Sequence, residues 1–332
     1  MKKLYLLLTG LLLLVLSVAG CGGQQEQEAA KGNDGKEVVL RVGAQPYPLY
    51  ASVYAAKEKG YLEEELAKVG AKYEWNDFKS GPLVNEAVKA GHADIGFMAD
   101  MPAILARSSG QDIQIISDVA FGEKALALIV KTDSPINSVA DIKGKKITYG
   151  KGTYAQHLLS LLLTQNDLTF DDIQSVNLAA GDIPSALASG QIDGAVIWEQ
   201  YISQTVTEGK ARVVADGTGI KRGNLVTYAV TSYAKENPKV IEAYIRAIKR
   251  GGEFIKEQPK EAAELLSKDF KVEPKVLERI FQNLDYSPAL TPADVEEIKK
   301  VKDYLFEQKL IETDIDADEF INLSYLQSAG VQ

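Results

Sequence analysis

Short apolar runs rich in β-branched residues alternate with helical patterns along most of this chain. VVLRVGA at residues 38–44 has the length and composition of a buried strand, and helical patterns occupy stretches such as 50–66 and 154–166. Strands that alternate with helices are typical of an α/β fold with mostly parallel sheets. The pattern changes towards the end, where residues 234–332 are expected to be almost wholly helical.

The N-terminus predicts export. MKKLYLLLTGLLLLVLSVAGC places two lysines before an apolar run and small residues before a cysteine, which is typical of a secretory signal peptide at residues 1–20. The sequence VAGC ending at Cys21 also resembles a bacterial lipobox, in which the cysteine receives a lipid. The alternative is an uncleaved anchor, but a spanning helix needs about 20 apolar residues. The polar segment 21–37 is expected to be a flexible tether.

Composition narrows the classes of function. Cys21 is the single cysteine, so no disulfide framework, CxxC redox pair or thiolate metal site is expected. The formal net charge of −9 argues against binding to nucleic acid, which needs a basic patch. A small anion is still compatible with this charge, because a few oriented dipoles in a cleft can outweigh it. The body at 38–332 exceeds the usual size of one core, about 250–300 residues, so we expect two lobes.

One segment recurs. AVKAGHADIGFM and ALASGQIDGAVIW share an alanine, a glycine and an aspartate at the same spacing, namely Ala87, Gly91 and Asp94, then Ala186, Gly190 and Asp193. Each copy reads as a helix that ends at glycine, a turn and a buried strand. Ligands of open α/β sheets collect outside the carboxyl ends of strands, so the loops after the two strands would face one cleft. Coincidence is the alternative, since αβ units share glycines and aspartates.

Helix starts that follow predicted strands are candidates for anion binding. Ser80 and Gly81 follow AKYEWNDF, and Gly152 and Thr153 follow KKITYG. A helix start exposes up to four unpaired N–H groups and roughly half a positive charge. Converging helix starts would form an anion site without lysine or arginine. The alternative is that each residue is an ordinary helix cap.

Other candidates carry side-chain chemistry. Asp100 would either cap its own helix or pair with an amine on the ligand, and Trp198 with Glu199 pose the same question in the later segment. Tyr47 could stack on a ligand or cover the cleft, and Gln45 ends the first strand. The two histidines lie in no cluster with metal-ligand spacing. We therefore expect neither an enzyme nor a cofactor or metal.

Several stretches together carry a family resemblance: VYAAKEKGYLEEE, FKSGPLVNEAVKAGHADIGF, YGKGTYAQHLLSLLL, IPSALASGQIDGAVIWEQY and YAKENPKVIEAYIRAIKRGGEFIKEQPKEAAELL. The chain resembles solute-binding lipoproteins of ATP-driven (ABC) importers for nitrate, sulfonates, taurine and thiamine-pyrimidine precursors. The resemblance implies a two-lobed, α/β, periplasmic-binding-protein type II fold with two strand crossovers, near 122–126 and 225–231, and a helical C-terminal tail. Lobe 1 would comprise 38–124 plus 228–332, and lobe 2 would comprise 125–227.

The resemblance also implies how such a chain works. It would bind a small organosulfonate-type anion or zwitterion between the lobes and deliver it to permease and ATPase subunits. It would be a monomer held by the lipid on Cys21 at the extracytoplasmic face of the cell membrane. By position, the family's cleft residues correspond to Gln45, Tyr47, Ser80, Gly81, Asp100, Met101, Gly152, Thr153, Tyr154, Asp182, Trp198 and Glu199.

The departures from the family bear on the solute. Many members have glycine and a small polar residue where this chain has Ala99 and Asp100, and many have W-E-P where it has WEQ. An acid at this position would suit an amine-bearing ligand such as taurine, or a neutral heterocycle. The alternative function is therefore a carrier of a thiamine-pyrimidine precursor or another small ring. An enzyme of the pyrimidine-synthase type is a further rival, but those enzymes carry a cysteine-rich segment.

Overall fold

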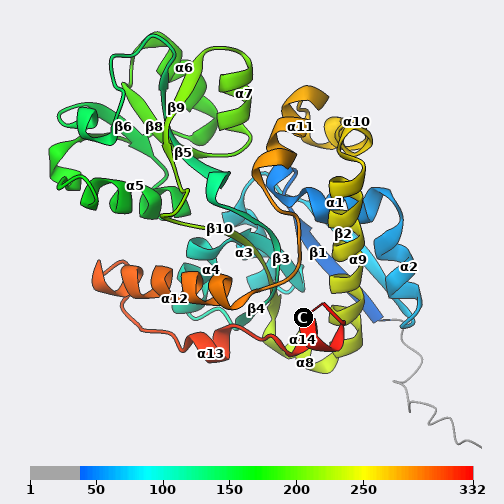
Figure 1. Cartoon of the computed structure of the whole chain (residues 1–332). Coiled ribbons are helices and arrows are strands. Elements are labelled where there is room, and N and C mark those ends of the chain that lie inside the picture. The colour runs from blue at the N-terminus through cyan, green and yellow to red at the C-terminus, as the bar shows by residue number, and fades with distance from the viewer. Residues whose placement is uncertain (1–37, 332) are drawn as a thin grey trace, which may run out of the picture. The chain divides into compact units, whose positions relative to one another are not determined.

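The computed structural model describes residues 38–331, which lie in one compact unit (Figure 1). The predicted signal peptide, the tether and Cys21 lie outside the described residues. Within 38–331, no helix is both long and apolar enough to span a bilayer.

Two five-stranded sheets organise the body. Sheet A has the order β2-β1-β3-β10-β4, with β2 Ala71–Asp77, β1 Val38–Ala44, β3 Ile95–Ala99, β10 Gly223–Val230 and β4 Ile113–Gly122. Sheet B has the order β7-β6-β8-β5-β9, with β7 Gln174–Val176, β6 Lys146–Tyr149, β8 Gly194–Trp198, β5 Leu126–Lys131 and β9 Ala211–Asp216. We call the elements on these sheets the A half and the B half. The α/β fold is thus as predicted.

The sheets are mixed rather than mostly parallel. In sheet A, β10 runs antiparallel to both β3 and β4, and in sheet B, β5 runs antiparallel to both β8 and β9. The other pairs are parallel. The antiparallel strands are the ones by which the chain enters each half from the other, so no crossover helix within the same sheet sets their direction.

The chain passes between the halves twice. It leaves β4 at Gly122 and enters β5 at Leu126 through a short 3₁₀ turn, η2 Glu123–Ala125, which is the position expected for the first crossover. It returns through residues 217–222, earlier than the expected 225–231. The reason is that residues 223–230 all pair with β4, so the apolar run predicted to cross belongs wholly to sheet A.

The helices follow the expected order. The A half contains α1 Ala51–Glu58, α2 Tyr61–Ala67, α3 Gly81–Lys89 and α4 Asp100–Ser108, and the B half contains α5 Tyr154–Thr164, α6 Ile183–Ser189 and α7 Tyr201–Thr207. The helical tail contains α8 Thr231–Glu236, α9 Pro238–Glu257, α10 Pro259–Phe270, α11 Pro274–Asn283, α12 Pro292–Glu307, α13 Ala317–Phe320 and α14 Ser324–Ser328. Further 3₁₀ turns are η1 Pro48–Tyr50, η3 Val139–Ile142, η4 Phe170–Asp172 and η5 Ala180–Asp182. The helix predicted over 50–66 is broken at Gly60, where φ is +73°.

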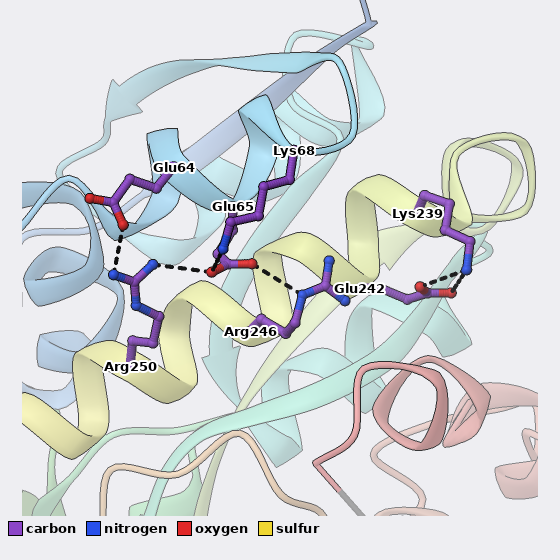
Figure 2. Close-up of polar contacts among 7 residues, drawn as sticks. All are labelled: Glu64, Glu65, Lys68, Lys239, Glu242, Arg246 and Arg250. Atoms are coloured by element: carbon purple, nitrogen blue, oxygen red, sulfur yellow. Dashed lines mark hydrogen bonds and ion pairs between the residues drawn. The ribbon is translucent and has the colours of Figure 1, made fainter. Parts of the chain in front are cut away.

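Helix α9 ties the tail to the first helices. It packs against α1 and α2 (Figure 1). Glu65 on α2 is buried and accepts bonds from Arg246 and Arg250 on α9, while Arg250 also bonds Glu64, as Figure 2 shows. These bonds join α2 to α9 although their residues lie 181 and 185 positions apart in the sequence.

The repeated segment forms equivalent units in the two halves. Gly91 and Gly190, at the ends of α3 and α6, both adopt φ near +74°. Asp94 Oδ2 accepts the backbone N–H of Arg41 at 2.8 Å, and Asp193 Oδ2 accepts that of Lys146, also at 2.8 Å. Each aspartate thus accepts a backbone N–H of the neighbouring parallel strand, β1 for Asp94 and β6 for Asp193. The shared glycine and aspartate have the same structural role in both copies.

Candidate functional site

A cleft of about 400 Å³ lies between the halves, at the carboxyl ends of β1, β3, β6 and β8. The A half contributes Gln45, Tyr47, Leu49, Tyr50, Ser80, Gly81, Pro82, Asn85, Met98, Ala99, Pro102 and Leu225. The B half contributes Lys151, Gly152, Thr153, Tyr154 and Trp198. A cavity of about 450 Å³ among α9, α10 and α11 is lined by the C-terminal tail alone, so the interlobe cleft is the better candidate site.

Most of the predicted ligand-binding residues line this cleft: Gln45, Tyr47, Ser80, Gly81, Gly152, Thr153, Tyr154 and Trp198. Four predicted residues do not line it: Asp100, Met101, Asp182 and Glu199. Asp100 and Glu199 do not line the cleft because their carboxylates bond to protein partners distant in sequence.

Asp100 is fully buried and faces away from the cleft. Its Oδ1 accepts the N–H of Met101 at 2.7 Å, and its Oδ2 lies 3.4 Å from Nζ of the buried Lys221. Burial raises the pKa of the Asp100 carboxyl, although Lys221 opposes that shift. The predicted pairing with a ligand amine is therefore corrected: Asp100, the first residue of α4, bonds an N–H of the first turn and pairs with Lys221. Met101 is fully buried as well.

Glu199 and Asp182 also lie outside the cleft. Glu199 is buried and accepts bonds from the backbone and hydroxyl of Ser203 and from Asn283 Nδ2, the last at 2.6 Å. Burial raises the pKa of Glu199, and these bonds partly offset the rise. Asp182 is exposed at the start of α6. Neither carboxylate reaches the ligand space.

Hydrogen bonds with the protein orient the amides of the A half. Gln45 Nε2 donates to the carbonyl of Phe97 at 3.0 Å, so its Oε1 is the end left for the cleft. The hydroxyl of buried Tyr228 donates to Asn85 Oδ1 at 2.9 Å, which leaves the amide N–H groups of Asn85 as donors to a ligand. Ser80 begins α3 without a capping bond from its hydroxyl. The A half therefore offers an acceptor at Gln45 Oε1 and donors at the Asn85 amide.

The loop before α5 supplies the wall of the B half. Thr153 caps α5, since its Oγ1 accepts the N–H of Ala155 at 3.3 Å, and Gly152 donates its N–H to Gln156 Oε1 at 2.8 Å. Some donors expected to be free are thus used within the loop. Tyr154 is among the lining residues, but its hydroxyl is buried and has no hydrogen-bond partner among the described residues.

Sequence reasoning missed Lys151 and Asn85. Lys151 is the single charged residue among those described in the cleft wall, and it lies in the glycine loop that was expected to act through backbone dipoles alone. The sequence could have identified Lys151, because it directly follows Gly150 at the end of a predicted strand. Asn85 lies one helical turn after Gly81, but nothing in sequence predicts its bond with Tyr228, 143 residues away.

Among the described residues, neither a metal-binding cluster nor a histidine belongs to the cleft wall. Over residues 38–331, no group of three or more His, Cys, Asp or Glu side chains is arranged to hold a metal ion. His157 is buried and stacks on Tyr304, with ring centroids 4.5 Å apart. Burial lowers the pKa of His157 to about 3, and it does not line the cleft. The role of His157 is to pack α5 against α12.

Comparisons with known proteins agree on one family. The family model described as NMT1/THI5 like matches residues 48–262. An aliphatic-sulfonate-binding protein of Escherichia coli K12 is 29% identical over 282 residues, covering 83% of this chain and 86% of the relative. A protein of Bacillus subtilis 168 assigned to the same binding role is 27% identical over 331 residues, covering 99% and 97%.

Solved structures give the same fold. The crystal structure of the periplasmic aliphatic sulphonate binding protein of Escherichia coli matches with a TM-score of 0.78 at 27% identity, covering 86% of this chain and 92% of that chain. Enzymes also occur among the relatives: a 4-amino-5-hydroxymethyl-2-methylpyrimidine phosphate synthase of Aspergillus parasiticus is 25% identical over 231 residues, covering 65% of this chain and 66% of the enzyme. The fold alone therefore does not decide between binding and catalysis.

Proposed function

The chain belongs to the NMT1/THI5-like family, and from that premise we propose that it is the extracytoplasmic solute-binding component of an ABC importer. It binds a small organosulfonate in the cleft and delivers it to the permease. The sulfonate-binding relatives of Escherichia coli and Bacillus subtilis support this assignment. The role is one of binding without catalysis, and the coverage of the sulfonate-binding relatives exceeds that of the pyrimidine synthase.

The chemistry of the cleft wall carries the proposal. No Asp or Glu occurs among the described residues that line it, whereas Lys151 and the amide of Asn85 can donate hydrogen bonds. A ligand with an anionic head satisfies these donors. An ammonium group would meet no carboxylate partner. We therefore favour simple alkane- or arylsulfonates over taurine, which reverses the expectation drawn from Asp100.

Apolar side chains leave room for the rest of the ligand. Leu49, Met98 and Leu225 line the A half, and Tyr50 and Trp198 add aromatic surface. Such walls fit an alkyl chain or a ring. The aromatic surface also supports a second candidate function, that of a carrier of a thiamine-pyrimidine precursor or another small heterocycle.

Closure is the mechanism we propose. The A half and the B half act as the two lobes, with the lobe boundaries predicted at 124/125 and 227/228 and the second boundary moved to the return crossover at 217–222. Contacts from both halves to one ligand favour the arrangement in which they approach, which shifts the population to the closed form. The closed form is the one that the permease recognises.

The anchor is part of the same proposal. Cys21 carries the lipid after removal of residues 1–20, and the mature chain is a monomer on the extracytoplasmic face of the cell membrane. Mass spectrometry of the N-terminal peptide should show a diacylglycerol-modified Cys21, and Cys21→Ser should abolish the modification. An unmodified N-terminal peptide in a bacterial host would contradict the proposed lipidation of Cys21.

A thermal-shift panel tests the ligand class. With 1-hexanesulfonate, taurine, nitrate and an aminopyrimidine, we expect the largest rise in Tm from 1-hexanesulfonate, because a ligand of the native state stabilises by about 2.7 kcal/mol at one hundred times its Kd. A larger rise with the aminopyrimidine would favour the second candidate. Absence of a shift with every sulfonate would rule out the sulfonate assignment.

A further inference from the structure

The segment 283–297, which we call the strap, links α11 to the first turns of α12 (Figure 1). It belongs to the helical tail, which the cleft does not use. Its contacts nevertheless fall on both crossovers between the halves and on the B half itself.

The strap holds the first crossover through the backbone. Phe121 and Asp285 exchange N–H···O bonds of 2.9 and 2.8 Å, and Asp118 donates its N–H to the Pro288 carbonyl at 3.0 Å. Gly122 has no space for a side chain, since a Cβ would lie 2.6 Å from the carbonyl oxygen of Asn283. The strap therefore lies directly against the point where β4 leaves sheet A.

The strap holds the second crossover through charges. The Nζ of Lys221 lies 2.9 Å from Glu297 Oε1, with the lysine side chain fully buried. Arg222 pairs with buried Asp294 at 2.8 Å, and its guanidinium lies over the ring of Phe121, 4.3 Å from the centroid. Buried pairs tolerate little displacement, because separating them leaves a charge without a partner.

The strap also reaches the B half. Asn283 Nδ2 donates to Glu199 Oε1 at 2.6 Å, and Glu199 directly follows Trp198 in the cleft wall. The two crossovers bond each other as well, through the N–H of Gly217 and the carbonyl of Glu123 at 3.0 Å. Every covalent connection between the halves is thus in contact with one tail segment.

We propose that the strap is a clamp on the hinge, which limits how freely the A half and the B half reorient, with the Asn283–Glu199 bond as its contact on the B half. The inference goes beyond solute binding. It concerns the ligand-free protein, so its test is independent of the proposed function.

Hydrogen–deuterium exchange of the full chain without ligand tests the clamp. Asn283→Asp places a second carboxylate against Glu199, and we expect peptides covering 199–203 and 217–222 to exchange about tenfold faster, as loss of a charge-assisted bond would predict. Peptides covering β1 and β6 should keep the wild-type rate. Asn283→Ala gives the same readout if the aspartate variant fails to fold.

Two further variants make the test specific. In the double variant Glu199→Gln with Asn283→Asp, the glutamine amide can donate to the new carboxylate, so exchange should return to within about twofold of wild type. Gln282→Ala, at the exposed neighbouring position, is the matched control and should change nothing. Wild-type exchange at 217–222 in Asn283→Asp, or equal acceleration of all peptides, would overturn the proposal.

Discussion

Lys151 is the residue on which the charge of the cleft depends. It comes from the loop after β6 and lies among lining residues that carry no other charge. Its side chain is exposed, so solvent weakens its attraction for an anion. The amide of Asn85, which Tyr228 orients, then offers a donor at shorter range. If the proposed function holds, we expect this combination to select for an anion by attraction first and by hydrogen-bond geometry second.

Replacing Lys151 by methionine should lower the affinity for 1-hexanesulfonate about tenfold, because one charge-assisted hydrogen bond is removed and the apolar part of the side chain stays. Titration calorimetry measures the change, and the loss should shrink at high salt. Lys146→Met, at the far end of β6, is the control and should stay within about twofold. Equal losses in both variants would mean that general charge, not Lys151, attracts the ligand.

At the scale of elements, strand ends predicted which residues line the cleft more reliably than side-chain type did. Gln45 follows β1 directly, and Gly152 and Thr153 lie in the loop after β6, so the order of elements brings them to the cleft. Asp100 also follows a strand, yet it turns inward to Lys221, 121 residues later. Sequence could locate the loop, but the direction of the side chain depended on a buried partner.

Helix α9 depends on a close approach that sequence does not reveal. At Gly251, a Cβ would overlap the carbonyl oxygen of Ser52 on α1. In an isolated helix, alanine stabilises by roughly 0.5–1 kcal/mol relative to glycine. Here we expect Gly251→Ala to lower the free energy of unfolding by about 3 kcal/mol, because α1 and α9 must separate.

Urea unfolding measures this change. Glu253→Ala, at an exposed position on the same helix, should change the free energy of unfolding by no more than about 0.5 kcal/mol. A stabilising effect of Gly251→Ala would show that the helices have room to separate at no cost.

At the scale of the whole molecule, Asp118 links stability to pH. Burial raises the pKa of its carboxyl well above the usual value, and repulsion from Asp294 and Asp100 adds to the rise, against attraction by Arg222. Neither oxygen has a hydrogen-bond partner among the described residues. The folded protein thus binds this proton more tightly than the unfolded chain does. The resulting stability is complete below the unfolded pKa of about 3.9 and is lost as pH rises through the folded pKa.

Asp118→Asn should therefore raise the Tm at pH 8 and leave it nearly unchanged at pH 4, since asparagine has no proton to lose. Thermal melts over this pH range measure the difference. Asp133→Asn, at an exposed position, is the control and should leave the pH profile as it is. A wild-type profile in Asp118→Asn would show that the carboxyl is not the source of the pH dependence.

The alternation of strands and helices determined the α/β class and the helical tail, because periodicity and length act locally along the chain. Glycine and aspartate at fixed spacing likewise predicted the two equivalent helix–turn–strand units, whose helices end next to Gly91 and Gly190. Only the tertiary structure decided that the return strand belongs to sheet A, that Asp100 and Glu199 bond within the protein, and that Asn85 and Lys151 line the cleft. These outcomes depend on partners far apart in sequence, and burial rather than local pattern sets where a polar side chain finds its bond.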